Sequence, residues 1–318
     1  MLSTRLCDVF AIDVPIIAAP FGPWEQVDLA AAVSNAGALG SVGTALRSVR
    51  ELRQQWNRLR ELTAAPFAIN HTTRPFDEEA FAATLAFKPA CISFHLGVPD
   101  DLIARAHEAG ILWIQQVMNR AQAEEAVAAG ADVIIAQGGE AGGNGGWVST
   151  MVLVPQVVDV AGDRPVVAAG GIADGRGLAA ALALGAQGVS MGTRFLASTE
   201  MRLARAWKDR IVAADALDAV KVANSERIMP PFNRPGGPAQ PRALQTSLTD
   251  QLRADPESID AGRVAADFRA ALLRGEGEDH LPFTGQSAGL VHDVLPAAEI
   301  VRRVVAEAEA TIATLRTD

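Results

Sequence analysis

The sequence predicts an α/β fold, a TIM (β/α)8 barrel with a mainly helical insertion after the eighth strand. Short apolar runs alternate with helix-like runs through residues 1–199, and the connections between them are short. Each apolar run is continuous rather than alternating, which is typical of parallel strands buried on both faces. Eight such units at regular spacing favour closure into a barrel over an open, doubly wound sheet.

The individual elements follow from apolar periodicity and from the glycine, proline and capping residues at their ends. The second helix has the clearest start, because Ser48 and Glu51 have the spacing of a capping box and the helix ends at Leu62. The predicted strands cover 14–19, 38–43, 66–70, 90–94, 111–115, 131–136, 165–170 and 187–192. The predicted helices cover 25–35, 48–62, 78–86, 100–109, 121–129, 152–160 and 177–184.

The pattern changes after residue 199. Residues 200–283 are richer in charge, and we interpret them as an insertion that covers the barrel mouth, with Met229, Phe232 and Arg242 nearest to the substrate. A dimerisation surface is the alternative use of this segment, and the two uses do not exclude each other. A final helix over 297–315 has apolar residues at helical spacing and is predicted to pack on the barrel wall, so that 1–199 and 284–318 form the barrel domain.

Composition excludes several classes of protein. A net charge of −9 without a long basic run argues against binding to a nucleic-acid backbone. The first ten residues lack the apolar core of a signal peptide and no apolar run has membrane-spanning length, so we expect a cytoplasmic protein. Two cysteines, Cys7 and Cys91, give neither a disulfide framework nor the spacing of a metal site.

The segment 137–147, QGGEAGGNGGW, is the most unusual stretch of the chain. Six of its eleven residues are glycine, so neither a helix nor a strand can continue from the apolar run before it. Glycine sites also end the next two predicted strands, at Gly170–Gly171 and at Gly192. Because the active site of a TIM barrel lies at the carboxyl ends of its strands, three such sites predict one binding face.

The last two glycine sites follow the seventh and eighth strands, where barrels commonly hold a phosphate with main-chain N–H groups. The uncharged polar residues at the other strand ends suit a flavin mononucleotide (FMN). This pattern alone leaves FMN and a sugar phosphate both open.

Seven stretches together resemble the nitronate monooxygenase family, formerly called 2-nitropropane dioxygenases, which includes flavin-dependent enoyl-acyl carrier protein reductases. They lie between residues 14 and 303 and read VPIIAAPFG, AAVSNAGALGSVG, FAIN, ISFHLG, AQGGEAGG, AAGGIADGRGLAAALALGAQGVSMGTRF and GQSAGLVHDVLPAAEIV. The resemblance implies a TIM barrel with noncovalent FMN. Ala19, Pro20 and Gly22 are then expected against the isoalloxazine ring, and Gln116 near the flavin. The other expected FMN contacts are Asn70, Gln137, Gly142, Gly143, Gly170, Gly171, Ser190, Met191, Gly192 and Thr193.

One position departs from the family's pattern. The usual motif reads EAGGH, with a histidine as active-site base or proton donor, whereas this chain has Asn144. An amide can hydrogen-bond a nitro group but cannot exchange a proton near neutral pH. His95 and His71 each follow a strand, and they are the candidate substitutes; for His71 a place on the cavity rim is the alternative. The resemblance also suggests that Glu140 orders the glycine loop.

Three functions follow from this resemblance. The first is FMN-dependent oxidation of alkyl nitronates by O2 to a carbonyl compound and nitrite, since an ionised nitronate needs no base. The second is NAD(P)H-dependent reduction of a quinone or an enoyl thioester. The third is a flavin-binding protein that has lost turnover. A GxGxxG dinucleotide fingerprint after a strand is absent, which favours the first function.

Overall fold

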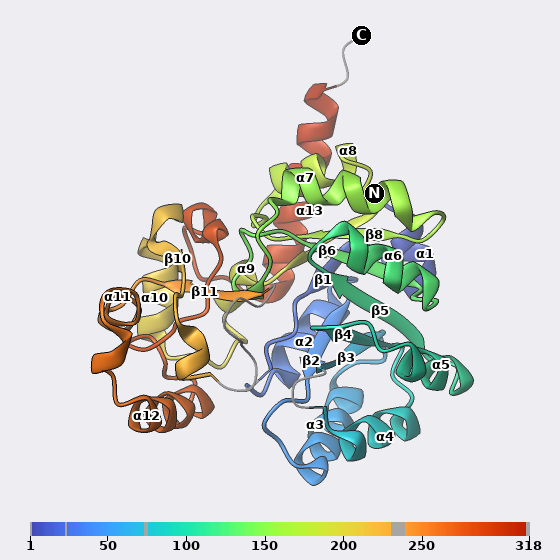
Figure 1. Cartoon of the computed structure of the whole chain (residues 1–318). Helices are drawn as coiled ribbons and strands as arrows, with labels where there is room; N and C mark the ends of the chain where they lie inside the picture. Colours follow the sequence, from blue (N-terminus) through green and yellow to red (C-terminus); the bar gives the residue numbers. More distant parts are fainter. Residues whose placement is uncertain (1, 23, 73–75, 230–238, 316–318) are drawn as a thin grey trace.

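The computed structural model describes residues 2–22, 24–72, 76–229 and 239–315, and it confirms the α/β barrel (Figure 1). Eight parallel strands pair in the order β1-β9-β8-β6-β5-β4-β3-β2. The ring closes between its two ends, because the N–H of Ala18 donates to Leu39 O at 2.9 Å and the N–H of Leu39 donates to Ile16 O at 2.9 Å. The barrel strands are β1 Ile16–Ala18, β2 Gly40–Gly43, β3 Phe67–Thr72, β4 Cys91–His95, β5 Leu112–Val117, β6 Val133–Gln137, β8 Val166–Ala169 and β9 Gly188–Met191.

A layer of helices surrounds the strands, as the alternation of apolar runs predicts. Ser48 and Glu51 form the predicted capping box, in which the Ser48 side chain accepts from the Glu51 N–H. The helices of the barrel layer are α2 Val27–Asn35, α3 Val49–Leu62, α4 Glu78–Phe87, α5 Asp100–Glu108, α6 Arg120–Ala128, α7 Thr150–Ala161, α8 Gly175–Ala183, the short α9 Thr193–Leu196, and α13 Ala297–Leu315.

The amino-terminal helix α1 (Arg5–Phe10) closes one end of the barrel. Its residues Leu6, Cys7 and Phe10 are buried in a cluster with inward-facing strand residues such as Ile17 and Ile114. A side chain at Gly188 would meet the Leu6 side chain at 2.5 Å, so this end is filled. An open cavity therefore has to lie at the other end, where the strands have their carboxyl termini.

The insertion is mainly helical, but it also contains two strands that the sequence did not indicate. Strands β10 (Ala219–Lys221) and β11 (Gln240–Leu244) form an antiparallel sheet with β7 (Gly143–Gly145). Strand β6 ends at Gln137, as the glycines predict, but Gly143–Gly145 form the separate strand β7, because β11 offers an edge on which extended glycines can pair. The helices of the insertion are α10 Arg205–Ala213, α11 Ser247–Ala254 and α12 Ala261–Leu273 (Figure 1).

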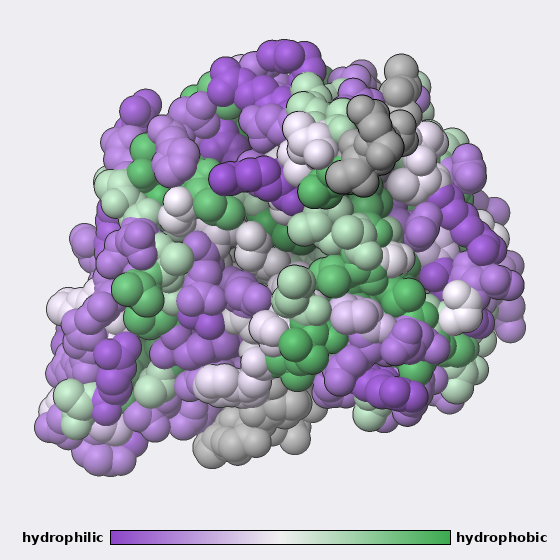
Figure 2. Space-filling view, turned by 90° about the horizontal axis from the view of Figure 1, so that it is seen from above, coloured by the Kyte–Doolittle hydropathy of each residue, from purple (hydrophilic) through white to green (hydrophobic). Residues whose placement is uncertain are grey.

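The final helix α13 packs on the barrel as predicted, with Ile300, Val301 and Val304 buried on one face. Gly175 permits the close approach of α8 and α13, since a Cβ there would lie 2.2 Å from the Ala308 nitrogen. None of the helices in the described ranges combines the length and apolar character that crossing a bilayer requires. Figure 2 shows a largely hydrophilic face in which hydrophobic residues gather near the centre.

Candidate functional site

A cavity of ≈ 270 Å³ lies at the carboxyl ends of the barrel strands. Nearly all of the residues predicted from the sequence line it. They are Ala19, Pro20, Gly22, Asn70, His71, His95, Gln116, Gln137, Gly142, Gly143, Asn144, Gly170, Gly171, Ser190, Gly192 and Thr193. Among the described lining residues there is no Asp, Glu, Lys or Arg, so any charge on a ligand has to be met by neutral groups.

Met191 is the predicted contact that the structure does not bring to the cavity. Its side chain is fully buried in the core cluster that contains Phe195 and Leu196. Successive residues of a strand face opposite sides, so Ser190 faces the cavity and Met191 faces the helices. Its carbonyl still accepts a hydrogen bond from the Ala19 N–H at 2.9 Å and so fixes the first strand end.

Two amide side chains leave buried oxygen atoms without a partner. Gln137 Oε1, at the end of β6, and Asn144 Oδ1, in the middle of β7, accept no hydrogen bond within the described residues. A buried polar atom without a partner is costly, so both positions favour a ligand that donates hydrogen bonds. Asn70 differs, because its amide nitrogen donates to Ser93 O at 3.1 Å and to Ser93 Oγ at 3.0 Å.

Main-chain N–H groups are available at the two predicted phosphate positions. Apart from the hydrogen bonds inside helices and strands, the N–H groups of Gly171, Gly192 and Thr193 donate to no main-chain oxygen of the described residues. A Cβ at Gly192 would meet only Ala19 Cβ at 3.6 Å and Phe21 Cε1 at 3.7 Å, and one at Gly143 would meet no atom within 4 Å. These glycines thus leave space in the cavity and do not merely permit tight packing of the protein on itself.

The two histidines have neutral rings in the fold. Burial lowers the pKa of His71 to about 3, opposed by Asp77, and burial lowers the pKa of His95 to about 4. His71 Nε2 lies 2.9 Å from Thr84 Oγ1 and its Nδ1 lies 3.4 Å from Thr44 Oγ1, which favours a structural role. His95, at the end of β4, lines the cavity with a ring that can accept a proton only at low pH.

Glu140 and Arg242 hold the glycine loop. The Glu140 carboxylate accepts from the Thr150 N–H at 2.9 and 3.0 Å and from Thr150 Oγ1 at 2.9 Å. Arg242 donates to Gly139 O at 3.2 Å through Nε and at 2.8 Å through Nη2. Arg242 does not line the cavity, so the prediction that it approaches the substrate is wrong. Its guanidinium is instead directed at the carbonyl of Gly139. Met229 does line the cavity, and Phe232 lies outside the described residues.

The loop after β1 and the end of β2 are also held by side-chain hydrogen bonds. Arg47 donates to Trp24 O at 2.8 Å, to Gly43 O at 2.8 Å and to Gly22 O, and burial lowers its pKa to about 10. Trp24 Nε1 donates to Leu272 O at 2.6 Å, which ties the loop after β1 to helix α12 of the insertion.

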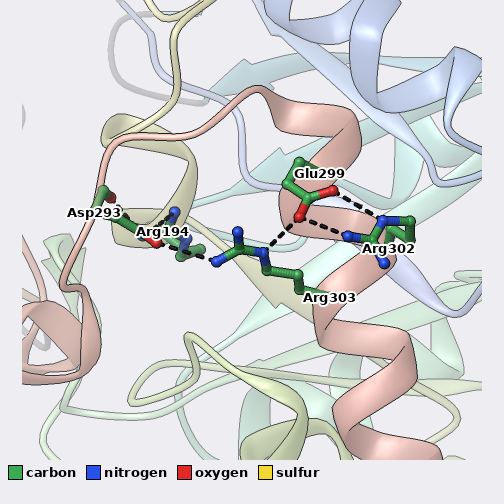
Figure 3. A network of polar contacts seen from close by, with 5 residues as sticks. All are labelled: Arg194, Asp293, Glu299, Arg302 and Arg303. Atoms are coloured by element: carbon green, nitrogen blue, oxygen red, sulfur yellow. Dashed lines mark hydrogen bonds and ion pairs between the residues drawn. The ribbon is translucent and has the colours of Figure 1, made fainter.

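Arg194, directly after Thr193, anchors the last strand end to helix α13 (Figure 3). Its buried guanidinium donates to Asp293 O at 2.9 Å and to Asp293 Oδ1 at 2.8 Å. Asp293 Oδ2 also lies 3.2 Å from Arg303, which shares Glu299 with Arg302. This network holds the turn at Gly192 and Thr193 in place without presenting a charge to the cavity.

The insertion supplies an apolar wall that the sequence did not reveal. Leu272 from α12 and Phe283 line the cavity together with Met229, and the loops of the barrel add Phe21 and Leu46. The apolar pattern of α12 predicts a buried helix face, but it does not indicate that this face borders the cavity. Trp147, in contrast, is 64% exposed and does not line the cavity.

Comparison with known proteins matches residues 3–84 and 71–307 to a family described as nitronate monooxygenase. The chain is 33% identical to a nitronate monooxygenase of Paraburkholderia phytofirmans, across 98% of this chain and 96% of that protein. It is 36% identical to a (3aS,4S,5R,7aS)-5-hydroxy-7a-methyl-1-oxo-octahydro-1H-indene-4-carboxyl-CoA dehydrogenase of Mycobacterium tuberculosis, across 85% of this chain and 72% of that protein. Among solved structures, FabK from Thermotoga maritima superposes with a TM-score of 0.89 and 34% identity, across 99% of both chains.

Proposed function

The chain belongs to the nitronate monooxygenase family, a family of flavin-dependent oxidoreductases, and from this premise we propose that it binds FMN and oxidises alkyl nitronates with O2 to a carbonyl compound and nitrite. One observation carries the choice of substrate. Position 144, where the family's histidine is expected, holds an amide in a cavity whose described lining residues carry no charge. A nitronate is already ionised, so its oxidation requires no base at that position.

The residues of the cavity fit FMN. The N–H groups of Gly171, Gly192 and Thr193 are suited to a phosphate, because such groups bind anions without a counter-charge. The unpartnered Gln137 Oε1 and Asn144 Oδ1 are suited to hydrogen-bond donors of the ligand, such as the single ring N–H of an oxidised flavin and the hydroxyl groups of its ribityl chain. Ala19, Pro20 and Gly22 are small or flat enough to lie beside the ring system. Bound FMN would supply the redox chemistry, taking electrons from the substrate and passing them to O2.

The protein's own side chains would position the substrate and exclude water. The Asn144 amide nitrogen would donate to a nitronate oxygen, and it neither takes nor gives a proton. His95 lines the cavity and burial strongly lowers its pKa, so at neutral pH its ring is uncharged and one of its two nitrogens is an acceptor. We further propose that residues 200–283 act as the roof of the cavity, through Met229, Leu272 and Phe283.

Anaerobic mixing tests this proposal. A primary alkyl nitronate should bleach the flavin absorbance of the purified holoprotein within the time of a turnover, and readmitted O2 should restore it. NADH under the same conditions should reduce the flavin far more slowly. Rapid reduction by NADH and none by any nitronate would reject nitronate oxidation.

A second candidate is redox chemistry on an acyl thioester, as a reductase of an enoyl thioester or as a dehydrogenase. Two observations favour it: the 36% identical relative is named as a carboxyl-CoA dehydrogenase, and the apolar wall is suited to a bulky acyl group. Anaerobic mixing with an acyl-CoA separates the candidates, because only a thioester enzyme should exchange electrons with it.

A further inference from the structure

The strand that carries Asn144 has little support of its own. Strand β7 is three residues long, and opposite Asn144 stands Pro241 of β11, which has no N–H to donate. Four of the six residues from Gly142 to Trp147 are glycines, which have no side chain that could pack and hold the segment. Other contacts therefore have to keep the Asn144 amide at the cavity.

Lys221, the last residue of β10, makes these contacts. Its ammonium group donates to Gly145 O at 2.9 Å, to Gly146 O at 2.9 Å and to Gln240 O at 3.0 Å. The three hydrogens of an ammonium group thus meet three carbonyls, two of them in the residues directly after Asn144. The Trp147 ring lies over the same group, with 5.4 Å from Nζ to the ring centroid.

A second cation lies beside Lys221, so its position costs electrostatic free energy unless favourable contacts offset the repulsion. Arg242 stands directly opposite it on β11, and like charges at facing positions of a sheet repel. Each cation is directed at carbonyls of the glycine segment, Arg242 at Gly139 and Lys221 at Gly145 and Gly146, so the two hold its opposite ends. Burial and Arg242 lower the pKa of Lys221 to about 8, and Glu140 opposes them.

We propose that Lys221 is a positioning residue for the reaction at this cavity: its ammonium group fixes the main chain after Asn144 and thereby aims the Asn144 amide. The assignment of a reaction to Asn144 rests on the proposed function, whereas the restraint of β7 does not. The insertion then does more than line the cavity, because its strands β10 and β11 hold the strand β7 that carries Asn144.

Hydrogen–deuterium exchange in the segment 142–147 tests the restraint directly. Lys221→Met keeps the apolar stem and removes the three donors, so amide exchange in 142–147 should become at least about tenfold faster. Lys208→Met is the matched control. Lys208 is another lysine of the insertion; it is buried where Lys221 is half-buried, and it donates to one carbonyl, Ser198 O at 2.6 Å, but does not contact the glycine segment. It should leave exchange in 142–147 unchanged.

Chemical rescue separates positioning from packing. In Lys221→Ala, added ethylammonium should restore slow exchange and the turnover number, whereas sodium at equal ionic strength should not. With a nitronate, the variant should lose kcat about tenfold or more while KM changes much less. Unchanged exchange in Lys221→Met, an equal effect in Lys208→Met, or no rescue by ethylammonium overturns the assignment. If the parent protein turns over no nitronate, the proposed function fails, and the exchange result still decides the restraint.

Discussion

Asn70, Gln137 and Ser190, at the ends of barrel strands, face the cavity with neutral polar groups, whereas Met229, Leu272 and Phe283 after the barrel face it with apolar ones. The barrel residues are fixed by neighbouring strands, whereas Leu272 is held by helix α12 and Phe283 by a bridge to Ala243 of β11. If the proposed function holds, this difference divides the tasks: the strand ends would bind the cofactor and place the reacting group, and the insertion would limit the size of the substrate and hold the glycine segment.

The largest expected effect comes from Asn144, on the barrel side. Asn144→His should raise kcat/KM for a neutral nitroalkane by about 100-fold to 10,000-fold, because a general base contributes that much when proton transfer limits the rate. Rates with the preformed nitronate serve as the internal control and should change by less than about threefold. Adding His95→Ala shows whether His95 already transfers protons in the parent. Equal rates on both substrate forms, unchanged in both variants, would contradict this role for position 144.

Gly192→Leu should weaken FMN binding by about 100-fold, or roughly 2.7 kcal/mol, because the side chain would occupy the space proposed for the cofactor. Backbone strain is not the cause, since the φ of Gly192 is −104°. FMN fluorescence quenching measures the affinity. Gly262→Leu, on helix α12, is the matched control, because its Cβ would meet only Asp260 Oδ1 at 3.7 Å. An unchanged affinity in Gly192→Leu would place FMN elsewhere.

The buried histidines make the barrel sensitive to acid. The pKa of His71 is about 3 in the fold and about 6.5 in the unfolded chain, so below pH 6.5 the unfolded state binds the proton first. The free energy of unfolding is therefore highest above pH 6.5 and falls by about 1.4 kcal/mol per pH unit for this histidine as the pH decreases towards 3.

Urea unfolding between pH 6 and 4 tests this slope. His71→Gln should reduce the dependence on pH by about 1.4 kcal/mol per unit relative to the parent, whatever it does to stability at pH 7. His292→Gln, at an exposed position, should leave the slope unchanged. The same slope in His71→Gln and the parent would show that His71 is not buried as a neutral ring.

The smallest expected effect tests the apolar wall. Leu272 is 8% exposed and lines the cavity, whereas Leu273 is 50% exposed and does not line it. Leu272→Ala should lower the preference for a six-carbon over a two-carbon nitronate by about five- to tenfold, as the loss of one to two buried methylene contacts implies. Leu273→Ala should leave the ratio of kcat/KM values unchanged. An effect of equal size in both variants would assign substrate size selection to some other surface.

The sequence by itself determined the barrel, because each strand–helix unit is encoded locally. Continuous apolar runs, the capping box at Ser48 and the glycines at strand ends act within a few residues, and the structure has eight parallel strands and the helices between them. The glycine sites followed from the same pattern, since all parallel strands end at one edge of the barrel, and the other expected contacts followed from the family resemblance. The Met191 side chain lies away from the cavity because a one-residue step along a strand changes the face.

Only the tertiary structure showed which residues hold the glycine segment and which line the cavity from the insertion. The pairing of β7 with β11, the contacts of Lys221 with Gly145 across 76 positions and the contacts of Arg242 with Gly139 across 103 positions join segments that share no local pattern. A lysine or an arginine in a sequence has many solvent-exposed places open to it. Three carbonyls within hydrogen-bond distance of one ammonium group exist only after the barrel and the insertion have packed together.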